Sequence, residues 1–571
     1  MRVNVSSLYH KKKHRQVIEL YENNKSDFVK NSSALLMVSG SYASLKLYNN
    51  AIAILNTLIH DDFELGQVLP LISFCYSQSG AYKFAIQTGL IALKHNLTSP
   101  LAYNSLGVAF MKEKRYREGI QALITACELQ PDNYDAWSNL GNAYVAIADY
   151  NNAINALQKA IALSSADRLA CDNLMLAIGY CDHLNDKERD KIRKSLSRFY
   201  PPQAKYFQSN WRNDKIKLGF VSGDFRQHAV TFFFLSLLQN INRDEFEIFC
   251  YSNSQQRDAF TKKIENLSNK FKKILPNTDK EVAQIINDDK IDVLFDLSGH
   301  TAHNRVSVFS YNPAKLNVGW LGFGLPTANP AIKYWLVDNI TNPEEECKFS
   351  GINLLKLDPI FLSFSCDEAV EINFEKSGKP NDKIFRFGSF NNFSKLSDQT
   401  INLWYQILET TQNTQLIIKC KQFNEGGFRE KVLQRFARFN TEWERVVLRG
   451  QLRSYDDHMH FFGSVDVALD PFPYNGTTTT SECLLMGVPV LTLEGDGHLG
   501  RVGMSIMLET GLESFVANTT ADYVRIAKDL ASGASFPNRF EVREMFLKSA
   551  IGNAKLFSKS FENTMKDLMK S

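Results

Sequence analysis

Hydrophobic positions in the first third of the chain repeat with a fixed period. A tyrosine recurs every 34 residues, at Tyr48, Tyr82, Tyr116 and Tyr150. Three residues after each tyrosine stands a small residue, and the next residue is always isoleucine. Apolar positions three and four residues apart predict helices, and small residues let two packed helices approach closely. The pattern therefore predicts four helix–turn–helix units stacked into a solenoid, whose extended concave face binds peptide or protein.

The length of the period identifies the type of repeat. A period of 34 residues is that of the tetratricopeptide repeat, and its best copies here run over 103–131 and 137–160. The highly charged segment that follows has helical apolar spacing and ends at Pro201–Pro202, which interrupts the pattern. We therefore assign residues 1–182 to a tetratricopeptide repeat domain and residues 183–212 to a helical linker.

From residue 215 the apolar pattern changes to short runs with helical segments between them. KIKLGFVS, FEIFCYS and IDVLFDLSG read as buried strands, and IFRFGSF, QLIIKCK and DVALDPF form a second series. This alternation predicts two α/β halves, residues 213–375 and 376–571, facing a cleft lined by the carboxyl ends of their strands. The amphipathic pattern over 546–571 predicts a terminal helix that packs back across the halves.

Composition and charge narrow the function classes. The 571 residues correspond to several domains, and 44% hydrophobic with 22% charged residues is ordinary globular composition. With 65 basic and 62 acidic residues, a net charge of +3 gives no overall electrostatic reason to bind nucleic acid or an anionic membrane. We therefore expect neither nucleic acid nor membrane as a partner.

Cysteine usage and the N-terminus bear on the cellular compartment. The nine cysteines are an odd number, are widely spaced and include no CxxC pair, which predicts neither a disulfide framework nor a zinc site. The first residues lack the apolar core of a signal peptide, and no run reaches the ~18 apolar residues of a membrane span. We expect a cytoplasmic protein.

The most informative stretch for chemistry is 466–495, DVALDPFPYNGTTTTSECLLMGVPVLTLEG. After a strand, a turn at Asn475-Gly476 leads into four threonines that open a helix. Free N–H groups at a helix start, with hydroxyls beside them, suit a diphosphate, so we select Thr478 and Thr479 as phosphate contacts. Glu482, one turn further, is placed to accept hydrogen bonds from ribose hydroxyls. The alternative is a threonine that caps the helix together with a capping acid.

Other strand ends carry charged and titratable residues. Lys395 follows a strand in a polar loop, where an ammonium would neutralise a leaving diphosphate; the alternative is a solvated surface lysine. Three more loops carry histidines that we expect to face one cleft. These loops contain His228 with Asp224, His300 and His303 with Asp296, and His458 with His460.

The absence of several sequence motifs also argues against particular classes of enzyme. The chain has no GxGxxG, Walker loop, HExxH or GxSxG, which argues against dinucleotide oxidoreductases, P-loop kinases, zincins and serine hydrolases. No Asp-x-Asp pair stands in the α/β region to hold a metal beside a sugar nucleotide. We therefore expect a chemistry without metal or other cofactor.

Several long motifs resemble those of a known family. GFVSGDFRQH, IDVLFDLSGHTAHN, GWLGFGLPT, FGSFNNFSK, KCKQF, DDHMHFF and PFPYNGTTTTSECLLMGVP follow one another in family order. Over essentially its whole length the chain is similar to the tetratricopeptide-containing O-GlcNAc transferase and SPINDLY family of protein O-glycosyltransferases, glycosyltransferase family 41. The resemblance implies a GT-B fold of two Rossmann-like halves and an inverting, metal-independent transfer of a sugar from a nucleotide donor to Ser or Thr of a protein.

The resemblance also implies roles for individual residues. Lys395 would be the essential phosphate-binding lysine, and His228 would sit at the junction of donor and acceptor. The nucleotide-sugar site would comprise His458, Asn475, Gly476, Thr477, Thr478, Thr479, Glu482 and His300. The proton acceptor stays open among His228, Asp289, the donor phosphate and a water chain.

Departures from the animal enzymes leave the donor open. Thr477 stands where those enzymes have a histidine, and the run TTTTSE lies closer to the SPINDLY branch, which includes enzymes that use GDP-fucose. We favour UDP-GlcNAc as donor, with GDP-fucose as the alternative. Two further hypotheses are a catalytically inactive tetratricopeptide scaffold and a transferase acting on a glycan or lipid.

Overall fold

The computed structural model describes residues 5–28, 31–59, 62–96, 98–164, 168–203, 207, 211–364, 382–424, 428–437 and 443–570. The chain forms two compact units, Met1–Leu174 and Met175–Ser571. The helix α12 (Arg168–Tyr180) crosses this division, which therefore falls before the boundary expected at residue 182. None of the described helices is both long and apolar enough to span a membrane.

The first unit consists of antiparallel helix pairs. Its helices are α1 (Val5–His10), α2 (His14–Asn23), α3 (Lys25–Phe28), α4 (Ser32–Ser44), α5 (Tyr48–Asn56), α6 (Asp62–Gln78), α7 (Tyr82–His95), α8 (Pro100–Lys112), α9 (Tyr116–Leu129), α10 (Tyr134–Ala146) and α11 (Tyr150–Leu163). Each tyrosine of the 34-residue period is the first residue of a helix, the second of its pair, so the predicted repeats are confirmed in phase as well as in number.

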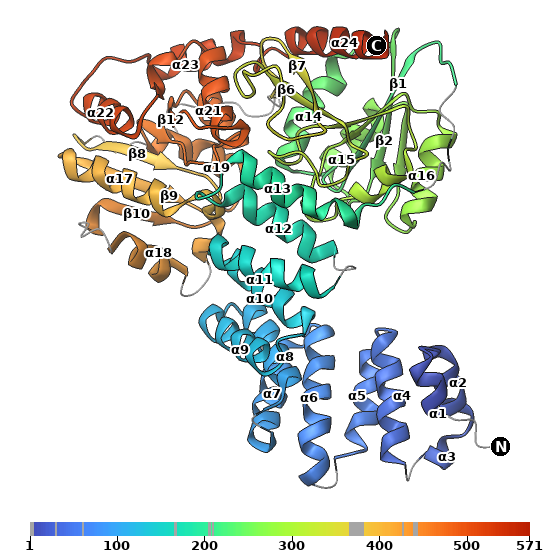
Figure 1. The fold of residues 1–571 in the computed structure, drawn as a ribbon. Helices are drawn as coiled ribbons and strands as arrows, with labels where there is room; N and C mark the ends of the chain where they lie inside the picture. Colours follow the sequence, from blue (N-terminus) through green and yellow to red (C-terminus); the bar gives the residue numbers. More distant parts are fainter. Residues whose placement is uncertain are drawn as a thin grey trace. The chain divides into compact units, whose positions relative to one another are not determined.

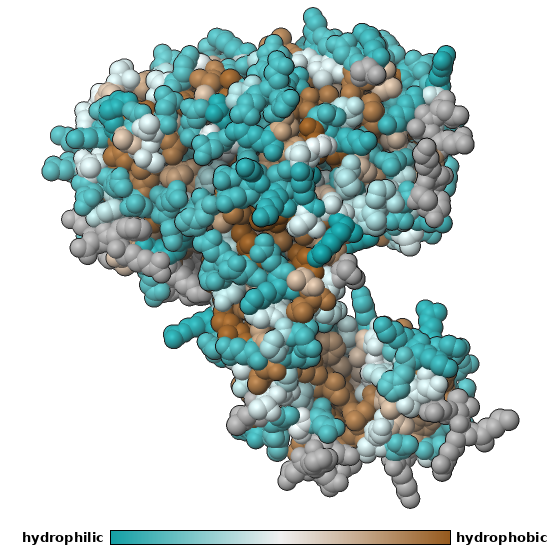
Figure 2. All heavy atoms as spheres, in the orientation of Figure 1, coloured by the Kyte–Doolittle hydropathy of each residue, from teal (hydrophilic) through white to brown (hydrophobic). Residues whose placement is uncertain are grey.

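Small residues allow close packing inside each repeat. A Cβ on Gly107 of α8 would lie 2.4 Å from the Leu123 side chain of α9, and one on Gly141 of α10 would lie 2.5 Å from the Leu157 side chain of α11. Both contacts are shorter than a real Cβ shows, so a larger residue at either position would force the facing leucine to shift. Figure 2 shows hydrophobic residues gathered on the visible face of this unit.

The second unit contains two parallel sheets (Figure 1). The first runs in the order β3-β2-β1-β4-β5-β6-β7, and the second in the order β10-β9-β8-β11-β12-β13. Each sheet is doubly wound from a central first strand, which is the arrangement of a Rossmann-like fold. The strands are β1 (Ile216–Ser222), β2 (Phe246–Ser252), β3 (Lys270–Lys273), β4 (Val293–Asp296), β5 (Leu316–Gly319), β6 (Tyr334–Asp338), β7 (Asn353–Leu357), β8 (Phe385–Ser389), β9 (Thr414–Lys419), β10 (Val446–Arg449), β11 (Val467–Leu469), β12 (Val490–Leu493) and β13 (Val516–Ala517).

Helices connect many of the strands, as parallel pairing requires, and further helices precede the first strand or follow the last. They are α13 (Asp186–Leu196), α14 (Ala229–Asn240), α15 (Ala259–Leu267), α16 (Asp279–Asp288), α17 (Asp398–Thr410), α18 (Phe428–Ala437), α19 (Tyr455–Phe461), α20 (Thr478–Leu485), α21 (His498–Glu509), α22 (Thr520–Ala531), α23 (Arg539–Lys548) and α24 (Ala554–Lys570). Short 3-10 turns fill several loops, η1 (Ser197–Phe199), η2 (Val306–Tyr311), η3 (Phe393–Lys395), η4 (Lys421–Asn424), η5 (Trp443–Arg445), η6 (Phe462–Ser464) and η7 (Glu513–Phe515).

Helix α13, expected as part of a linker, is packed against the first α/β half. The buried Arg193 guanidinium donates to the carbonyl oxygens of Thr327 (3.2 Å) and Ser350 (2.7 Å). The Asp190 carboxylate accepts from the Ser350 hydroxyl at 2.7 Å. These contacts bind the helix to the loops after β5 and before β7.

The terminal helix α24 returns to the first half, although it follows the second in sequence (Figure 1). Its Phe557 ring stacks on Trp320 at 6.1 Å, and its Phe561 ring packs on Phe295 at 5.7 Å. The Glu562 carboxylate accepts from the backbone N–H of Asn242 at 2.7 Å. The prediction is confirmed in part: the helix begins at Ala554 rather than 546, and these contacts are with the half that was assigned to 213–375.

Candidate active site

A cleft of about 360 Å³ separates the two α/β halves. The first half contributes the start of α14 at His228 and the loop after β5, and the second contributes loops after β8, β11 and β12. The side chains of Lys395, Tyr474 and His498 line it together with the three threonines at the start of α20. These are carboxyl ends of parallel strands, where ligands bind in open α/β sheets.

Lys395 ends η3, which follows β8, and it is partly buried rather than exposed. Its Nζ donates to the Asn475 carbonyl oxygen at 2.6 Å and lies 4.2 Å from the centroid of the Tyr474 ring. Burial lowers the pKa of the amine to about 8, and the charge of Asp470 opposes that effect. The alternative of a solvated surface lysine is wrong, because Tyr474 and the Asn475 carbonyl of the turn after β11 cover the side chain.

Asp470 directly follows β11 and holds that turn in place. Its carboxylate accepts from the backbone N–H of Gly476 at 2.6 Å and from the Thr492 hydroxyl at 3.0 Å. Burial raises the pKa of this carboxyl to about 7. A Cβ on Gly476 would lie 2.8 Å from the carboxylate, so the turn needs glycine. Sequence reasoning missed Asp470, although an acid immediately after a strand was a readable signal.

The start of α20 is left without a side-chain cap. Thr477 occupies the N-cap position and makes no capping hydrogen bond, while Thr477, Thr478 and Thr479 all line the cleft. The alternative of a threonine cap with a capping acid is therefore wrong. The buried Asn475 side chain supports the turn instead, since its Nδ2 donates to the Pro471 carbonyl oxygen at 3.0 Å. This arrangement leaves the first N–H groups and hydroxyls of the helix for an anion.

Glu482 and His458 belong to a polar cluster that we call the Glu482 cluster, formed by Lys419, Tyr455, His458 and Glu482. The Lys419 ammonium donates to His458 Nδ1 at 2.7 Å, which leaves the proton of the ring on Nε2, 3.4 Å from the Glu482 carboxylate. The Tyr455 hydroxyl donates to the other carboxylate oxygen at 3.1 Å. Burial lowers the pKa of Lys419. Sequence reasoning gave no role to Lys419 or Tyr455, although both lie in or beside the quoted motifs.

His228 is the N-cap of α14 and the one predicted histidine in the described lining of the cleft. Its Nδ1 accepts from the Val230 backbone N–H at 3.4 Å and lies 3.7 Å from the Asp224 carboxylate. Burial lowers the pKa of the ring, which favours the neutral form. With Nδ1 as acceptor, the neutral ring carries its proton on Nε2. In that form His228 donates a hydrogen bond to a ligand rather than taking a proton from it.

The prediction of Asp289 as a candidate proton acceptor is wrong, because Asp289 is not among the described residues that line the cleft. It caps the end of α16 ahead of β4, and so lies at the amino rather than the carboxyl end of that strand. Its buried carboxylate is paired with Lys270 and Lys272 and accepts from the Tyr251 hydroxyl at 2.9 Å. A carboxylate engaged in this way is not a candidate base.

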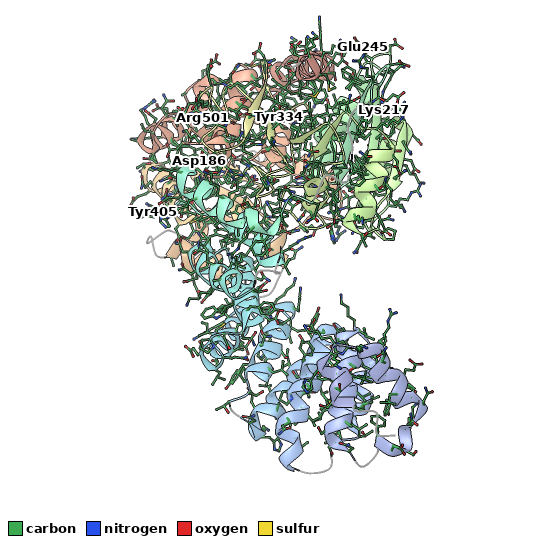
Figure 3. All side chains as sticks on the ribbon, turned by 45° about the vertical axis from the view of Figure 1, so that its right-hand side comes forward. Asp186, Lys217, Glu245, Tyr334, Tyr405 and Arg501 are labelled. Atoms are coloured by element: carbon green, nitrogen blue, oxygen red, sulfur yellow. The ribbon has the colours of Figure 1, made fainter. Side chains whose placement is uncertain are left out.

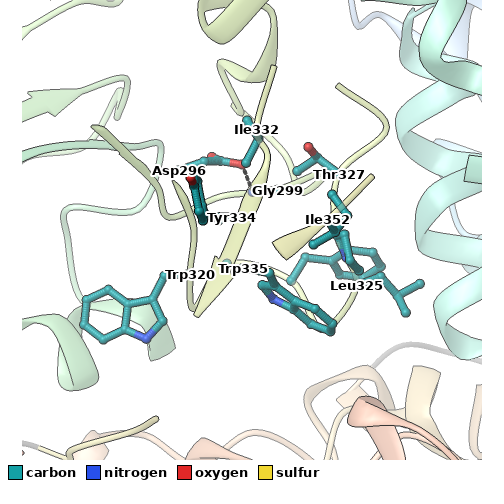
Figure 4. A pocket seen from close by; sticks show the side chains of 13 residues that line it. Asp296, Gly299, Trp320, Leu325, Thr327, Ile332, Tyr334, Trp335 and Ile352 are labelled. Atoms are coloured by element: carbon teal, nitrogen blue, oxygen red, sulfur yellow. Dashed lines mark hydrogen bonds between the residues drawn. The ribbon is translucent and has the colours of Figure 1, made fainter. Parts of the chain in front are cut away.

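The prediction that His300 belongs to the nucleotide-sugar site is also wrong for the cleft as described. The ring is fully buried, and its Nε2 accepts from the backbone N–H of Ala328 at 2.9 Å, so it fixes one loop against another. Figure 4 shows a small pocket beside this loop, where the Asp296 carboxylate accepts from the Gly299 backbone N–H at 3.1 Å. The neighbouring His303 carbonyl accepts from Asn253. Neither His300 nor His303 lines the described cleft.

His498 was not predicted, yet it lines the cleft as the first residue of α21. Its Nδ1 lies 2.8 Å from the Asn342 Oδ1, and its ring packs on Trp335 at 4.4 Å. Burial lowers the pKa of the ring to about 3. Further along the same helix, Arg501 (labelled in Figure 3) donates to the Ile340 carbonyl oxygen at 2.7 Å, which ties α21 to the first half.

Comparison with known proteins identifies the family. The model of glycosyl transferase family 41 matches residues 194–357 and 368–561, which is more than half of the chain. The chain belongs to this family. Repeat models match the first unit, one named TPR repeat over residues 109–147 and one named tetratricopeptide repeat over residues 134–167. The resemblance and the fold class expected from the sequence are both confirmed.

Among similar proteins are two named as probable UDP-N-acetylglucosamine-peptide N-acetylglucosaminyltransferase SPINDLY. The rice protein is 30% identical over 73% of this chain and 46% of its own length, and the barley protein is 32% identical over 70% and 43%. The chain thus spans less than half the length of these relatives. A solved structure, a lysine-to-methionine mutant of the Thermobaculum terrenum O-GlcNAc transferase, matches with a TM-score of 0.75 and 25% identity, covering 89% of this chain and 98% of that one.

Proposed function

We propose that the second unit binds a nucleotide sugar in the cleft and transfers the sugar to a Ser or Thr hydroxyl of a protein. The observation that carries this proposal is the pairing of the Lys395 amine with the uncapped start of α20 in one cleft. The N–H groups, the hydroxyls of Thr478 and Thr479 and a cation together form a site for a diphosphate. Family membership supports the same chemistry.

The donor we favour is UDP-GlcNAc, with GDP-fucose as the alternative. The names of the rice and barley relatives support the first donor. The nucleoside would lie at the Glu482 cluster, where the carboxylate accepts hydrogen bonds from ribose hydroxyls and His458 packs beside them. Glu482 is the third residue after Thr479 in α20, so one short helix serves both the diphosphate and the ribose.

In the transfer step, the acceptor oxygen forms a bond to the anomeric carbon while the bond from that carbon to the diphosphate oxygen breaks. Negative charge grows on the departing diphosphate, where Lys395 and the start of α20 stabilise it. His228 donates a hydrogen bond from its Nε2–H to an oxygen at the junction of donor and acceptor and keeps its proton. None of the described residues that line the cleft is Asp or Glu, and we assign the acceptor's proton to a donor phosphate oxygen.

We propose that this reaction needs no metal ion, because the lysine and the helix N–H groups supply the positive potential at the diphosphate. In support, the residues that the structure describes contain no group of three His, Cys, Asp or Glu side chains placed to hold a metal. The chain's own residues would thus carry the whole electrostatic role.

The tetratricopeptide unit would hold the protein acceptor. Its repeats stack into an array, and such arrays present extended binding surfaces. Deleting residues 1–130 should therefore impair glycosylation of a protein more than affinity for the donor. Equal loss of both in a folded deletion variant would instead make the repeats a support for the catalytic unit.

Calorimetric titration with UDP and with GDP tests the nucleotide site. We expect one of the two to bind the wild-type protein, and Glu482→Ala to weaken that nucleotide about 10-fold or more, since the ribose loses a charged acceptor. Glu513→Ala, on the exposed start of η7 in the same half and outside the described cleft lining, serves as the control and should bind as the wild type does. A folded wild-type protein that binds neither nucleotide contradicts the proposed function.

A further inference from the structure

The ring of His498 is held in one orientation on the wall of the cleft. Its Nδ1 is 2.8 Å from the Asn342 Oδ1, and Trp335 (4.4 Å) and Phe361 (5.1 Å) pack on it from two sides. Only 5% of the residue is exposed, yet the residue lines the cleft. A side chain that is fixed on three sides and open on the fourth is preorganised for a ligand.

The surroundings also fix the protonation of this ring. His498 is the first residue of α21, so the positive end of the helix dipole lies beside it, and burial further disfavours the charged form. With the Asn342 Oδ1 as partner, Nδ1 carries the proton, and Nε2 keeps a free lone pair. A ring whose pKa is about 3 does not take up a proton at neutral pH, so His498 is no general base. It is a hydrogen-bond acceptor.

The position of the ring relative to the diphosphate site indicates which part of a donor it meets. Lys395 and the threonines at the start of α20 line the same cleft as His498. The Glu482 cluster, where the nucleoside is proposed to bind, is not part of the described lining. The portion of the donor that enters the cleft beside His498 is therefore the sugar.

Several other residues that line the cleft are apolar. Leu321, Phe323, Phe361 and Leu362 contribute to the wall, and none of their side chains accepts a hydrogen bond. Binding sites of this kind use a few fixed polar groups among apolar ones to orient the ligand. A sugar hydroxyl that enters this wall finds a fixed acceptor in the imidazole nitrogen.

We propose that His498 is a specificity-determining residue, whose Nε2 accepts a hydrogen bond from a hydroxyl group of the transferred sugar. This inference rests on the proposed function, because it takes the cleft as the site of a nucleotide sugar. It adds a discriminating contact to the sugar itself, separate from those that hold the nucleotide. A donor lacking the matched hydroxyl would leave the acceptor without a partner.

Calorimetry on two variants tests the proposal. His498→Phe keeps a ring against Trp335 but removes the lone pair, and His498→Gln restores an acceptor oxygen. We measure affinity for UDP, GDP, UDP-GlcNAc and GDP-fucose, after thermal melting shows that each variant folds. We expect His498→Phe to lower the affinity for the sugar nucleotide about 5- to 10-fold and to leave the affinity for UDP and GDP unchanged. His498→Gln should restore most of the affinity for the sugar nucleotide. If His498→Phe does not fold, His498→Leu takes its place.

Deoxy analogues of the donor, lacking one sugar hydroxyl at a time, identify the contact. One analogue should bind the wild-type protein and His498→Phe equally. The proposal is overturned if His498→Phe binds the sugar nucleotide as the wild type does, or if it weakens UDP or GDP to the same extent as the sugar nucleotide. A folded wild-type protein that binds no nucleotide overturns the proposed function, and the inference with it.

Discussion

Replacing Lys395 with methionine should slow sugar transfer by roughly 10²–10³-fold. Methionine keeps a long apolar side chain beside the Tyr474 ring but removes the ammonium. A preorganised charge against a developing anion is worth about 3–4 kcal/mol, and the charge on the diphosphate is larger in the transition state than in the bound donor. The loss should therefore fall on turnover more than on donor affinity. Initial rates at saturating donor, together with calorimetric affinity, separate the two.

Lys395→Met should raise rather than lower the free energy of unfolding. Burial lowers the pKa of Lys395 from 10.5 to about 8, so the fold disfavours the charged amine by up to about 3 kcal/mol at pH 7. Methionine removes that cost, and we expect a higher melting temperature. The unfolded chain binds the proton up to higher pH than the folded protein does, so wild-type stability recovers as pH rises from 8 to 10.5. The difference between the two proteins should shrink over that range.

The value of kcat/KM for the donor should also follow the protonation of the Lys395 amine. With a pKa of about 8 in the protein without donor, the ammonium is about nine-tenths populated at pH 7, and kcat/KM for the donor should fall roughly tenfold per pH unit well above pH 8. Lys528→Met, on the exposed face of α22, is the matched control and should behave as the wild type does. A folded Lys395→Met protein with near wild-type turnover would remove this lysine from the mechanism.

Three further predictions concern the metal, the turn and the repeats. Transfer should persist in excess EDTA; abolition by EDTA with rescue by Mn²⁺ would reject the site as described. Asp470→Asn should move the alkaline fall of kcat/KM for the donor to lower pH, because the Asp470 charge raises the pKa of Lys395; an unmoved pH profile would contradict this coupling. Gly141→Ala should lower the stability of the first unit by about 1–3 kcal/mol, since its Cβ would meet the Leu157 side chain at 2.5 Å. Denaturant unfolding measures that loss. Gly80→Ala is the comparison variant, because its Cβ would meet nothing within 4 Å while its φ is positive, so it shows the cost of backbone strain without crowding.

Periodic features of this protein were readable from sequence because they depend on local spacing. The tyrosine period gave the first residue of four helices, since a helix pair repeats its buried positions at fixed intervals. The strands were readable because parallel strands are buried on both faces and appear as short apolar runs. The threonines at 477–479 could be predicted as site residues because local sequence shows that they follow a strand and stand at the start of a helix.

Features that depend on side-chain direction or long-range contact were not readable. Lys395 is partly buried because Tyr474 and the Asn475 carbonyl close over it from a different strand end. His300 follows a strand as a site residue would, but its ring turns inward to Ala328. The error at Asp289 was avoidable, because it precedes its strand and so lies at the wrong end of the sheet. His498 follows β12 and carried the expected signal, which went unread.

The central claim is that this cleft transfers a sugar to proteins, and intact-protein mass spectrometry tests it most directly. Candidate acceptors are incubated with the wild-type protein and UDP-GlcNAc or GDP-fucose in parallel, with Lys395→Met as the matched control. We predict that wild-type protein adds one or more N-acetylhexosamine masses from UDP-GlcNAc, and that the Lys395→Met reaction gains far less mass over the same time. No mass gain from either donor, in a folded protein that also releases no nucleoside diphosphate, would contradict the claim.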